Sequence, residues 1–219
     1  YEKGILERCD FIKLDTQGSE LAILRGGKQF LSDHALGMEV EVEFRQLYKN
    51  QPLFRDVDKY VSEELNMELV DLRHSYWKYS EGFGTGQRRG SIIFANALYF
   101  RSPDKIIELC KKEPCGKARY IMGLIMYLAY GYADFSLRLM ALGRKEGILE
   151  EEAQTSLENA VRSYAGTFIY KVNKKFNGRI RSRIFLAASM LASIFDPRGG
   201  EWNTWGSHLG SRKKWNVFF

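Results

Sequence analysis

The chain has 219 residues, of which 45% are hydrophobic and 27% charged, a balance typical of a folded globular protein and not of a disordered one. Its charge is uneven: residues 1–104 carry 14 Lys and Arg against 17 Asp and Glu, a net of −3, and residues 105–219 carry 19 against 10, a net of +9. Three cysteines without a CxxC pair and three scattered histidines argue against a disulfide framework and a zinc site, and favour a reducing, cytoplasmic location.

We expect neither a signal peptide at the start of the given sequence nor a membrane-spanning segment within it. Residues 1–10 are mostly polar, unlike a signal peptide, and the most apolar stretch, residues 121–130, is shorter than the roughly 20 residues that span a membrane. The chain starts without Met, in what reads as the middle of a helix, so we expect a piece of a longer protein.

Residues 11–14 form a short apolar run that predicts a buried strand, ending in the loop Asp15-Thr16-Gln17-Gly18. Ser19 is placed to cap a helix that ends or is interrupted at Gly26-Gly27. Glu20 lies in the first turn of this helix, where the helix dipole favours a carboxylate.

Residues 36–44 alternate strictly between apolar and acidic side chains, which predicts a strand. The apolar positions are Met38, Val40, Val42 and Phe44, and the acidic ones are Glu39, Glu41 and Glu43. Because unpaired buried charges are costly, the acidic face is expected to be solvated or to border a polar cleft.

The remaining elements fall into two groups on either side of Pro103. Residues 52–65 predict a helix, 68–72 a strand, 74–90 a loop and 91–100 a strand, so the first part is an α/β unit with a mainly parallel sheet covered on both faces. Helices are expected from Asp104, over 117–142, over 150–175 and over 183–195, with an irregular tail from residue 196. We therefore place a segment boundary between residues 103 and 104.

The second group is basic and partly apolar. Residues 162–214 contain 11 Lys and Arg with interleaved aromatic residues, a composition that suits nucleic acid or an anionic membrane surface but also an ordinary solvated face. The apolar band over residues 121–142 suits oligomerisation.

Four blocks of the first part resemble one known family, the FkbM methyltransferases. They are CDFIKLDTQGSELAILRGG, GMEVEVEFRQLYKNQPLFRDVDKYV, the YWK of residues 76–78 and GSIIFANALYF, and together they cover about residues 5–101. Their order and the Asp-x-x-Gly-x-Glu spacing of the first block carry the resemblance. The family commonly has Asp where this chain has Asn96, so an acidic role is not expected there.

The resemblance implies the C-terminal half of a Rossmann-like class I methyltransferase sheet over residues 1–103, followed by a helical extension over 104–219. The strands would be the fourth to the seventh of the family, and the N-terminal half that binds the adenosine of S-adenosylmethionine would lie upstream. The glycine-rich residues 82–86 do not sit between a strand and a helix, so they are not the nucleotide loop.

Ligands of such sheets bind beyond the carboxyl ends of the strands. Asp15, Thr16 and Gln17 are therefore the expected cofactor-binding residues, and Asp15, Gln17 and Glu41 the expected catalytic ones. Asp15 is the first choice as the base that removes a proton from a hydroxyl acceptor, although it could instead cap its own turn. Asp15, Glu41 and Glu43 are candidate ligands of a divalent metal.

Basic and aromatic side chains in the loops at the same edge suit a sugar or an anionic acceptor. The candidates are Arg45, Tyr48, Trp77, Lys78 and Arg88. The function expected is thus S-adenosylmethionine-dependent O-methylation of a sugar or glycan hydroxyl, with this piece inactive alone. The alternative is a non-catalytic module that uses the basic helices to bind an anionic partner or to form a homo-oligomer.

Overall fold

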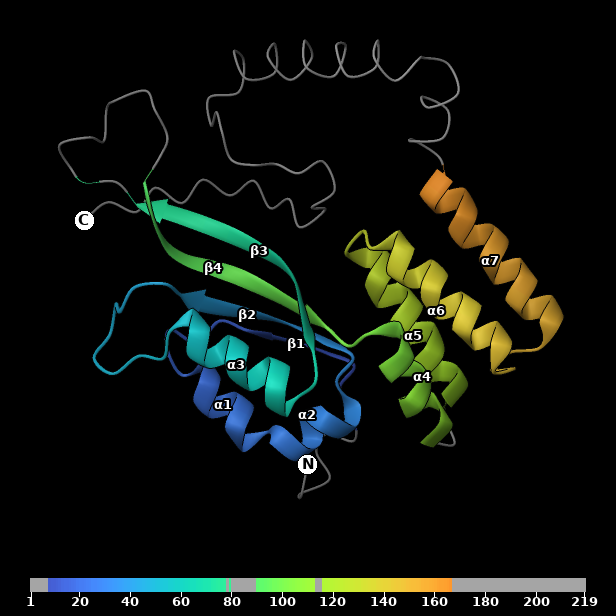
Figure 1. The fold of residues 1–219 in the computed structure, drawn as a ribbon, viewed down its shortest axis with the longest axis horizontal. Coiled ribbons are helices and arrows are strands. Elements are labelled where there is room, and N and C mark those ends of the chain that lie inside the picture. The colour runs from blue at the N-terminus through green and yellow to red at the C-terminus, as the bar shows by residue number, and fades with distance from the viewer. Residues whose placement is uncertain (1–7, 78, 80–89, 113–115, 167–219) are drawn as a thin grey trace, which may run out of the picture.

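The computed structural model describes residues 8–77, 79, 90–112 and 116–166 (Figure 1). The elements of the α/β part are β1 (Phe11–Leu14), α1 (Glu20–Gly26), α2 (Lys28–His34), β2 (Gly37–Glu43), α3 (Phe54–Glu64), β3 (Glu68–Trp77) and β4 (Ser91–Phe100). The strands occur in the predicted order. β3 is longer than expected, however, so residues 74–77 belong to a strand and not to the loop predicted from residue 74.

The four strands form one mixed sheet in the order β1-β2-β4-β3. β1 and β2 run parallel, whereas β4 is antiparallel to both β2 and β3. β1, β2 and β3 therefore share one direction, as a mainly parallel sheet requires, whereas the antiparallel β4 between β2 and β3 was not predicted. No helix separates β3 from β4 among the described residues, and an antiparallel neighbour needs no crossover helix.

One face of the sheet is covered by α1, α2 and α3. The alternate apolar residues of β2, namely Met38, Val40 and Val42, are fully buried there together with side chains of the three helices and of β4. The period-2 pattern of residues 36–44 thus places its apolar half against this helical layer.

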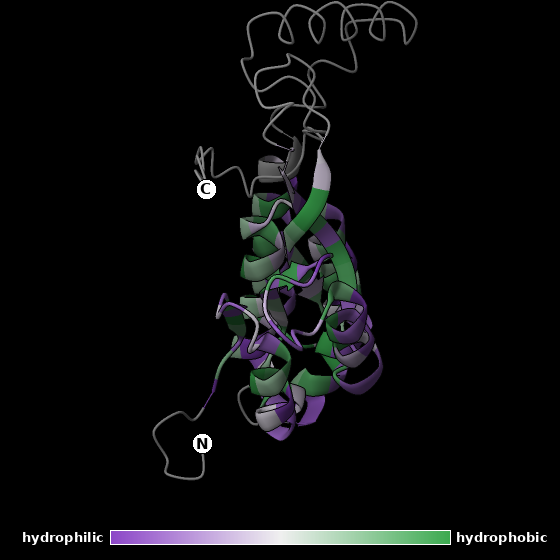
Figure 2. Cartoon of the chain, turned by 90° about the vertical axis from the view of Figure 1, so that its left-hand side faces the viewer, coloured by the Kyte–Doolittle hydropathy of each residue, from purple (hydrophilic) through white to green (hydrophobic). Residues whose placement is uncertain are grey.

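The other face is covered at one end by α4 (Pro103–Lys112), α5 (Gly116–Ala129), α6 (Ala133–Lys145) and α7 (Glu151–Gly166). Leu36, Leu98 and Phe100 of the sheet region lie in the same buried cluster as residues of these helices. In Figure 2, hydrophobic colour runs along much of the strands, whereas the helices carry both hydrophobic and hydrophilic residues.

The single helix predicted over residues 117–142 is wrong, because two helices meet at Gly131. Gly131 has a positive φ of 87°, a conformation that ends helices readily in glycine. The amide of Tyr132 donates to the carbonyl of Tyr127 at 2.8 Å, as expected of a glycine-terminated helix. The helix predicted over 150–175 corresponds to α7 up to residue 166. The remainder of that helix, the helix over 183–195 and the tail lie outside the described residues.

Two buried arginines that follow the sheet bind its N-terminal helices. Arg101, 5% exposed, donates to the carbonyl oxygens of Ala35 at 2.7 Å, Ser32 at 2.8 Å and Leu65 at 2.9 Å, and also to that of Leu31 at 3.2 Å. The carbonyl of Leu31 also accepts the amide of Ala35, whereas the other three, at the end of α2 and after α3, lie where helix-terminal carbonyls lack intrahelical partners.

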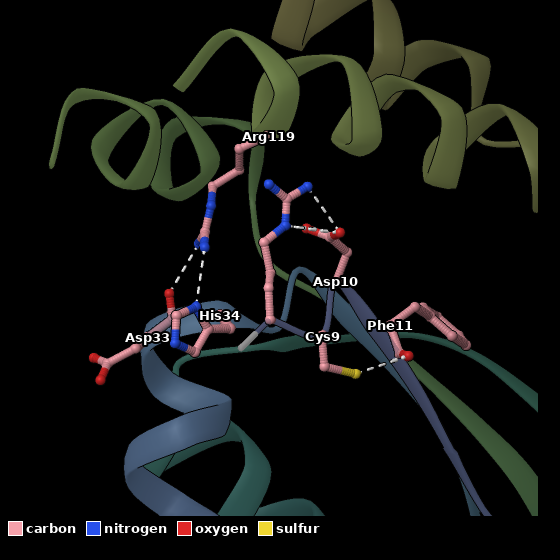
Figure 3. Close-up of polar contacts among 7 residues, drawn as sticks. Cys9, Asp10, Phe11, Asp33, His34 and Arg119 are labelled. Atoms are coloured by element: carbon pink, nitrogen blue, oxygen red, sulfur yellow. Dashed lines mark hydrogen bonds and ion pairs between the residues drawn. The ribbon is translucent and has the colours of Figure 1, made fainter. Parts of the chain in front are cut away.

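Arg119 of α5 makes the corresponding contact from the helical extension (Figure 3). Its Nη1 donates to the carbonyl of Asp33 at 2.9 Å, and its Nη2 lies 3.4 Å from Nδ1 of His34. Arg119 is fully buried, so this end of α2 is fixed by the extension as well as by β4. No helix in the described part of the chain is long and apolar enough to cross a membrane.

Candidate active site

The turn after β1 is held by the carboxylate of Glu20. This side chain, 2% exposed, accepts hydrogen bonds from the amide of Thr16 at 2.6 Å, its hydroxyl at 2.9 Å and the amide of Gly18 at 2.9 Å. Ser19 occupies the predicted N-cap position of α1, but its side chain makes no capping hydrogen bond, and Glu20 fixes the turn instead. Asp15 is not used to hold these amides, and its side chain is left for other contacts.

The backbone of this turn explains the glycine in its sequence. Gln17 and Gly18 both have positive φ angles, 58° and 105°. A Cβ on Gly18 would lie 3.1 Å from Nε2 of Gln51, so glycine is required here both by conformation and by the close approach of Gln51. The Asp-x-x-Gly-x-Glu spacing therefore specifies a fixed turn that exposes Asp15 and Gln17.

The parallel pairing of β1 and β2 brings the expected catalytic residues together. Nε2 of Gln17 donates to Oε2 of Glu41 at 3.0 Å and lies 3.3 Å from Oδ1 of Asp15. The hydroxyl of Tyr48 donates to Oε1 of Gln17 at 3.2 Å. Asp15, Gln17, Glu41 and Tyr48 thus form one polar group at the carboxyl ends of the two strands, where ligands of open α/β sheets bind.

Acidic neighbours and burial give two of these carboxyl groups unusual proton affinity. Burial, followed by the charge of Asp15, raises the pKa of Glu41 from 4.5 to about 7. Burial, followed by the charge of Glu20, raises the pKa of Glu43 to about 7 as well. Within the described residues no Lys, Arg or His lies at ion-pair distance from Asp15, Glu41 or Glu43, so nothing there offsets their charge. A carboxyl group with a pKa near 7 is suited to proton transfer at neutral pH.

The third acid of β2 has a different environment. Oε1 of Glu39 lies 2.9 Å from both Nζ of Lys13 and Nη2 of Arg73. Glu39 also raises the pKa of Tyr130 to about 12, after the larger effect of that tyrosine's burial. Two of the three acids, Glu39 and Glu43, are buried at 3% exposure, so the acidic face of this strand is neither wholly solvated nor chemically uniform.

The loop after β2 contains a residue that the sequence did not suggest. Gln51 is 8% exposed, and its Oε1 accepts the amides of Leu47 at 3.0 Å and Tyr48 at 3.1 Å. Its Nε2 is buried without a hydrogen bond of normal geometry, yet lies near enough to Glu43 to lower that group's pKa. A glutamine before a proline in a loop has no periodic pattern that would single it out.

The expected substrate-binding residues are only partly brought together. Tyr48 joins the polar group through Gln17, and Nη2 of Arg45 donates to Oγ of Ser91 at 3.3 Å, where β4 begins. Trp77 ends β3 directly opposite Ser91 in the register. Lys78 and Arg88 lie outside the described residues.

The metal prediction finds no support. Among the described residues, no group of three His, Cys, Asp or Glu side chains could hold a metal ion, and this includes Asp15, Glu41 and Glu43.

Comparison with known families supports the resemblance seen in the sequence. Residues 1–69 match the family described as the methyltransferase FkbM domain, which covers β1, α1, α2, β2, α3 and the first residues of β3. The match indicates a methyltransferase and includes Asp15, Gln17, Glu41 and Tyr48. No curated protein and no solved structure matches the chain.

Proposed function

We propose that the chain is part of an S-adenosylmethionine-dependent O-methyltransferase, with residues 1–103 as the C-terminal half of a Rossmann-like catalytic domain. One observation carries the proposal: within the segment that matches the FkbM domain, Asp15 and Glu41 meet at the carboxyl ends of two parallel strands. β1 is at the edge of the described sheet, which leaves room for upstream strands to pair with it.

The residues present fit one end of the cofactor. Asp15, Thr16 and Gln17 are exposed on a fixed turn, and their oxygens, with an uncompensated carboxylate among them, suit a positively charged group. When bound, the cofactor supplies a methyl group on a positively charged sulfur, which leaves as a neutral thioether. The residues that hold its adenosine would be upstream of residue 1.

The chain's own contribution is to take a proton and to orient the acceptor. A hydroxyl is a poor nucleophile at neutral pH, and a nearby carboxylate that removes its proton assists the attack. Tyr48, 50% exposed, and Arg45 offer an aromatic face and a planar donor at the same edge, which suits a sugar or glycan hydroxyl. Trp77, Lys78 and Arg88 remain predicted acceptor contacts.

Isothermal titration of the full-length protein with S-adenosylmethionine tests the proposal. We expect measurable binding that weakens at least about tenfold in Asp15→Asn, because the substitution removes the exposed carboxylate that would attract the cofactor's positively charged sulfur. The matched control is Asp33→Asn, which removes the charge of a partly exposed acid on α2. Absence of binding at millimolar cofactor, with circular dichroism showing a folded protein, would contradict the proposal.

The alternative function, in which the helical extension binds an anionic partner or forms a homo-oligomer, can be tested by separate measurements. α4, α5 and α6 share a buried cluster with Leu98 and Phe100, so we treat residues 104–166 as supporting the sheet. Binding of an anionic partner by residues 162–214 predicts affinity that falls steeply with salt. Oligomerisation through α5 remains a prediction, tested by sedimentation.

A further inference from the structure

We infer that Gln17 holds Asp15 and Glu41 as a pair that shares one proton, and that Glu41 is the member that takes the acceptor's proton. The inference rests on the proposed function for its role in catalysis. Its structural part, the shared proton, concerns only residues of this chain and can be measured without cofactor or acceptor.

The side-chain amide of Gln17 lies between the carboxylates of Asp15 and Glu41. Its Nε2 lies 3.0 Å from Glu41 and 3.3 Å from Asp15, so one amide group contacts a carboxylate on each strand. Its backbone is held in a left-handed conformation, and Tyr48 fixes the other end of the amide. The side chain of Gln17 touches the two acids and is thus a positioning residue, not the group that reacts.

Charge explains why the pair should share a proton. Two carboxylates held by one amide repel each other when both are ionised, and no described cation lies at ion-pair distance from either. Along the same strand, Glu39 has two cations within 2.9 Å. A single proton between Asp15 and Glu41 removes most of the repulsion, as in other paired carboxylates.

Position selects Glu41 as the member that holds the proton. Its backbone lies within β2, one residue beyond the last residue that is paired with β1, and is paired with Asn96 of β4, and its side chain is partly buried. Asp15 is exposed in the turn, where water stabilises its charge. Burial and the charge of Asp15 accordingly raise the pKa of Glu41 to about 7.

The neighbouring Gln51 acts on the next acid of β2. Gln51 is more than nine-tenths buried, and its Nε2 lies against Gly18 and close to Glu43 without a hydrogen bond of normal geometry. Its contact with Glu43 lowers the pKa of that group, whereas the charge and hydrogen bond of Asp15 raise that of Glu41. Transfer starts from the ionised pair, which is present near pH 7: the acceptor's O–H bond breaks, its proton goes to the Glu41 carboxylate and becomes the shared proton, the oxygen bonds the methyl carbon, and the carbon–sulfur electron pair stays on sulfur.

The experiment follows the carboxyl carbons of the full-length protein by NMR as pH is varied, in four backgrounds. These are the wild type, Asp15→Asn, Gln17→Leu and the double variant. In the wild type, Glu41 should titrate near pH 7 and Asp15→Asn should lower that midpoint by about one pH unit. In the Gln17→Leu background the same change should lower it by less than about half a pH unit, because the acids are no longer held together.

Gln29→Leu is the matched control, because Nε2 of Gln29 also donates to an aspartate, Asp33, at 2.8 Å on exposed α2. In that background the effect of Asp15→Asn on Glu41 should be unchanged. A Glu41 midpoint below about pH 5 in the wild type, or an equal effect of Asp15→Asn with and without Gln17, would overturn the inference. Loss of cofactor binding with the coupling intact would contradict the proposed function alone.

Discussion

The acidic side chains at the two ends of β2 have opposite electrostatic environments. At its beginning, Glu39 lies between Lys13 and Arg73, and two cations surround one carboxylate. At its end, Glu41 and Glu43 face other acids and have no described ion pair, so burial raises the pKa of both. The first arrangement compensates a buried charge with residues of β1 and β3, and the second leaves two carboxyl groups with raised pKa values, as the proposed proton transfer requires.

The largest expected effect on stability comes from removing Glu39, the acid of β2 that has two cationic partners. Glu39→Leu removes the carboxylate between Lys13 and Arg73 and leaves the partly buried guanidinium without this partner. The free energy of unfolding should fall by about 3 kcal/mol in urea titrations at pH 7. Glu63→Leu, on an exposed face of α3, is the matched control and should change it by less than about 0.5 kcal/mol. A loss below 1 kcal/mol for Glu39→Leu would mean that the ion pairs contribute little.

A smaller effect on stability, of opposite sign, is expected from removing the charge of Glu41 near the other end of β2. Because the pKa of Glu41 is raised from 4.5 to about 7, the folded protein loses stability as pH rises through that window. Glu41→Gln cannot ionise, so it should be more stable than the wild type by about 1 kcal/mol at pH 8, after allowance for the group's partial exposure. At pH 4 the two should be equal. A destabilised variant at pH 8 would contradict the uncompensated environment.

The smallest effect should come from Lys13→Met. The side chain of Lys13 is 54% exposed, and Glu39 retains its bond to Arg73 when the lysine is removed. We expect a loss below about 0.5 kcal/mol that disappears in 1 M salt. A loss comparable to that of Glu39→Leu would show that the lysine, rather than the arginine, compensates the buried charge.

Much of the α/β part could be predicted from local sequence. The alternation over residues 36–44 predicts β2 and its two faces, and the short apolar run predicts β1. Because parallel neighbours end at one edge, the sequence also predicts that Asp15 and Glu41 meet, as they do through Gln17. The FkbM resemblance is confirmed over residues 1–69.

Long-range pairings and loop contacts could not be predicted in this way. Apolar alternation does not encode strand direction, so the antiparallel insertion of β4 between β2 and β3 was missed. The helix break at Gly131 competes with a strong apolar pattern that continues on both sides. The contacts of Glu39 with Arg73 and of Gln51 with its loop depend on residues brought together only by the folded chain.

The buried guanidinium of Arg101 has a consequence for how the chain is made. It binds carbonyl groups at Leu31, Ser32 and Ala35, which leave the ribosome many residues earlier. During synthesis, the carbonyl groups at the end of α2 therefore cannot bind Arg101 until β4 has been made. Arg119, which binds the same end of α2, is made later still. A nascent chain that stops before residue 101 should carry α2 with a frayed end, and so present a target for chaperones and proteases.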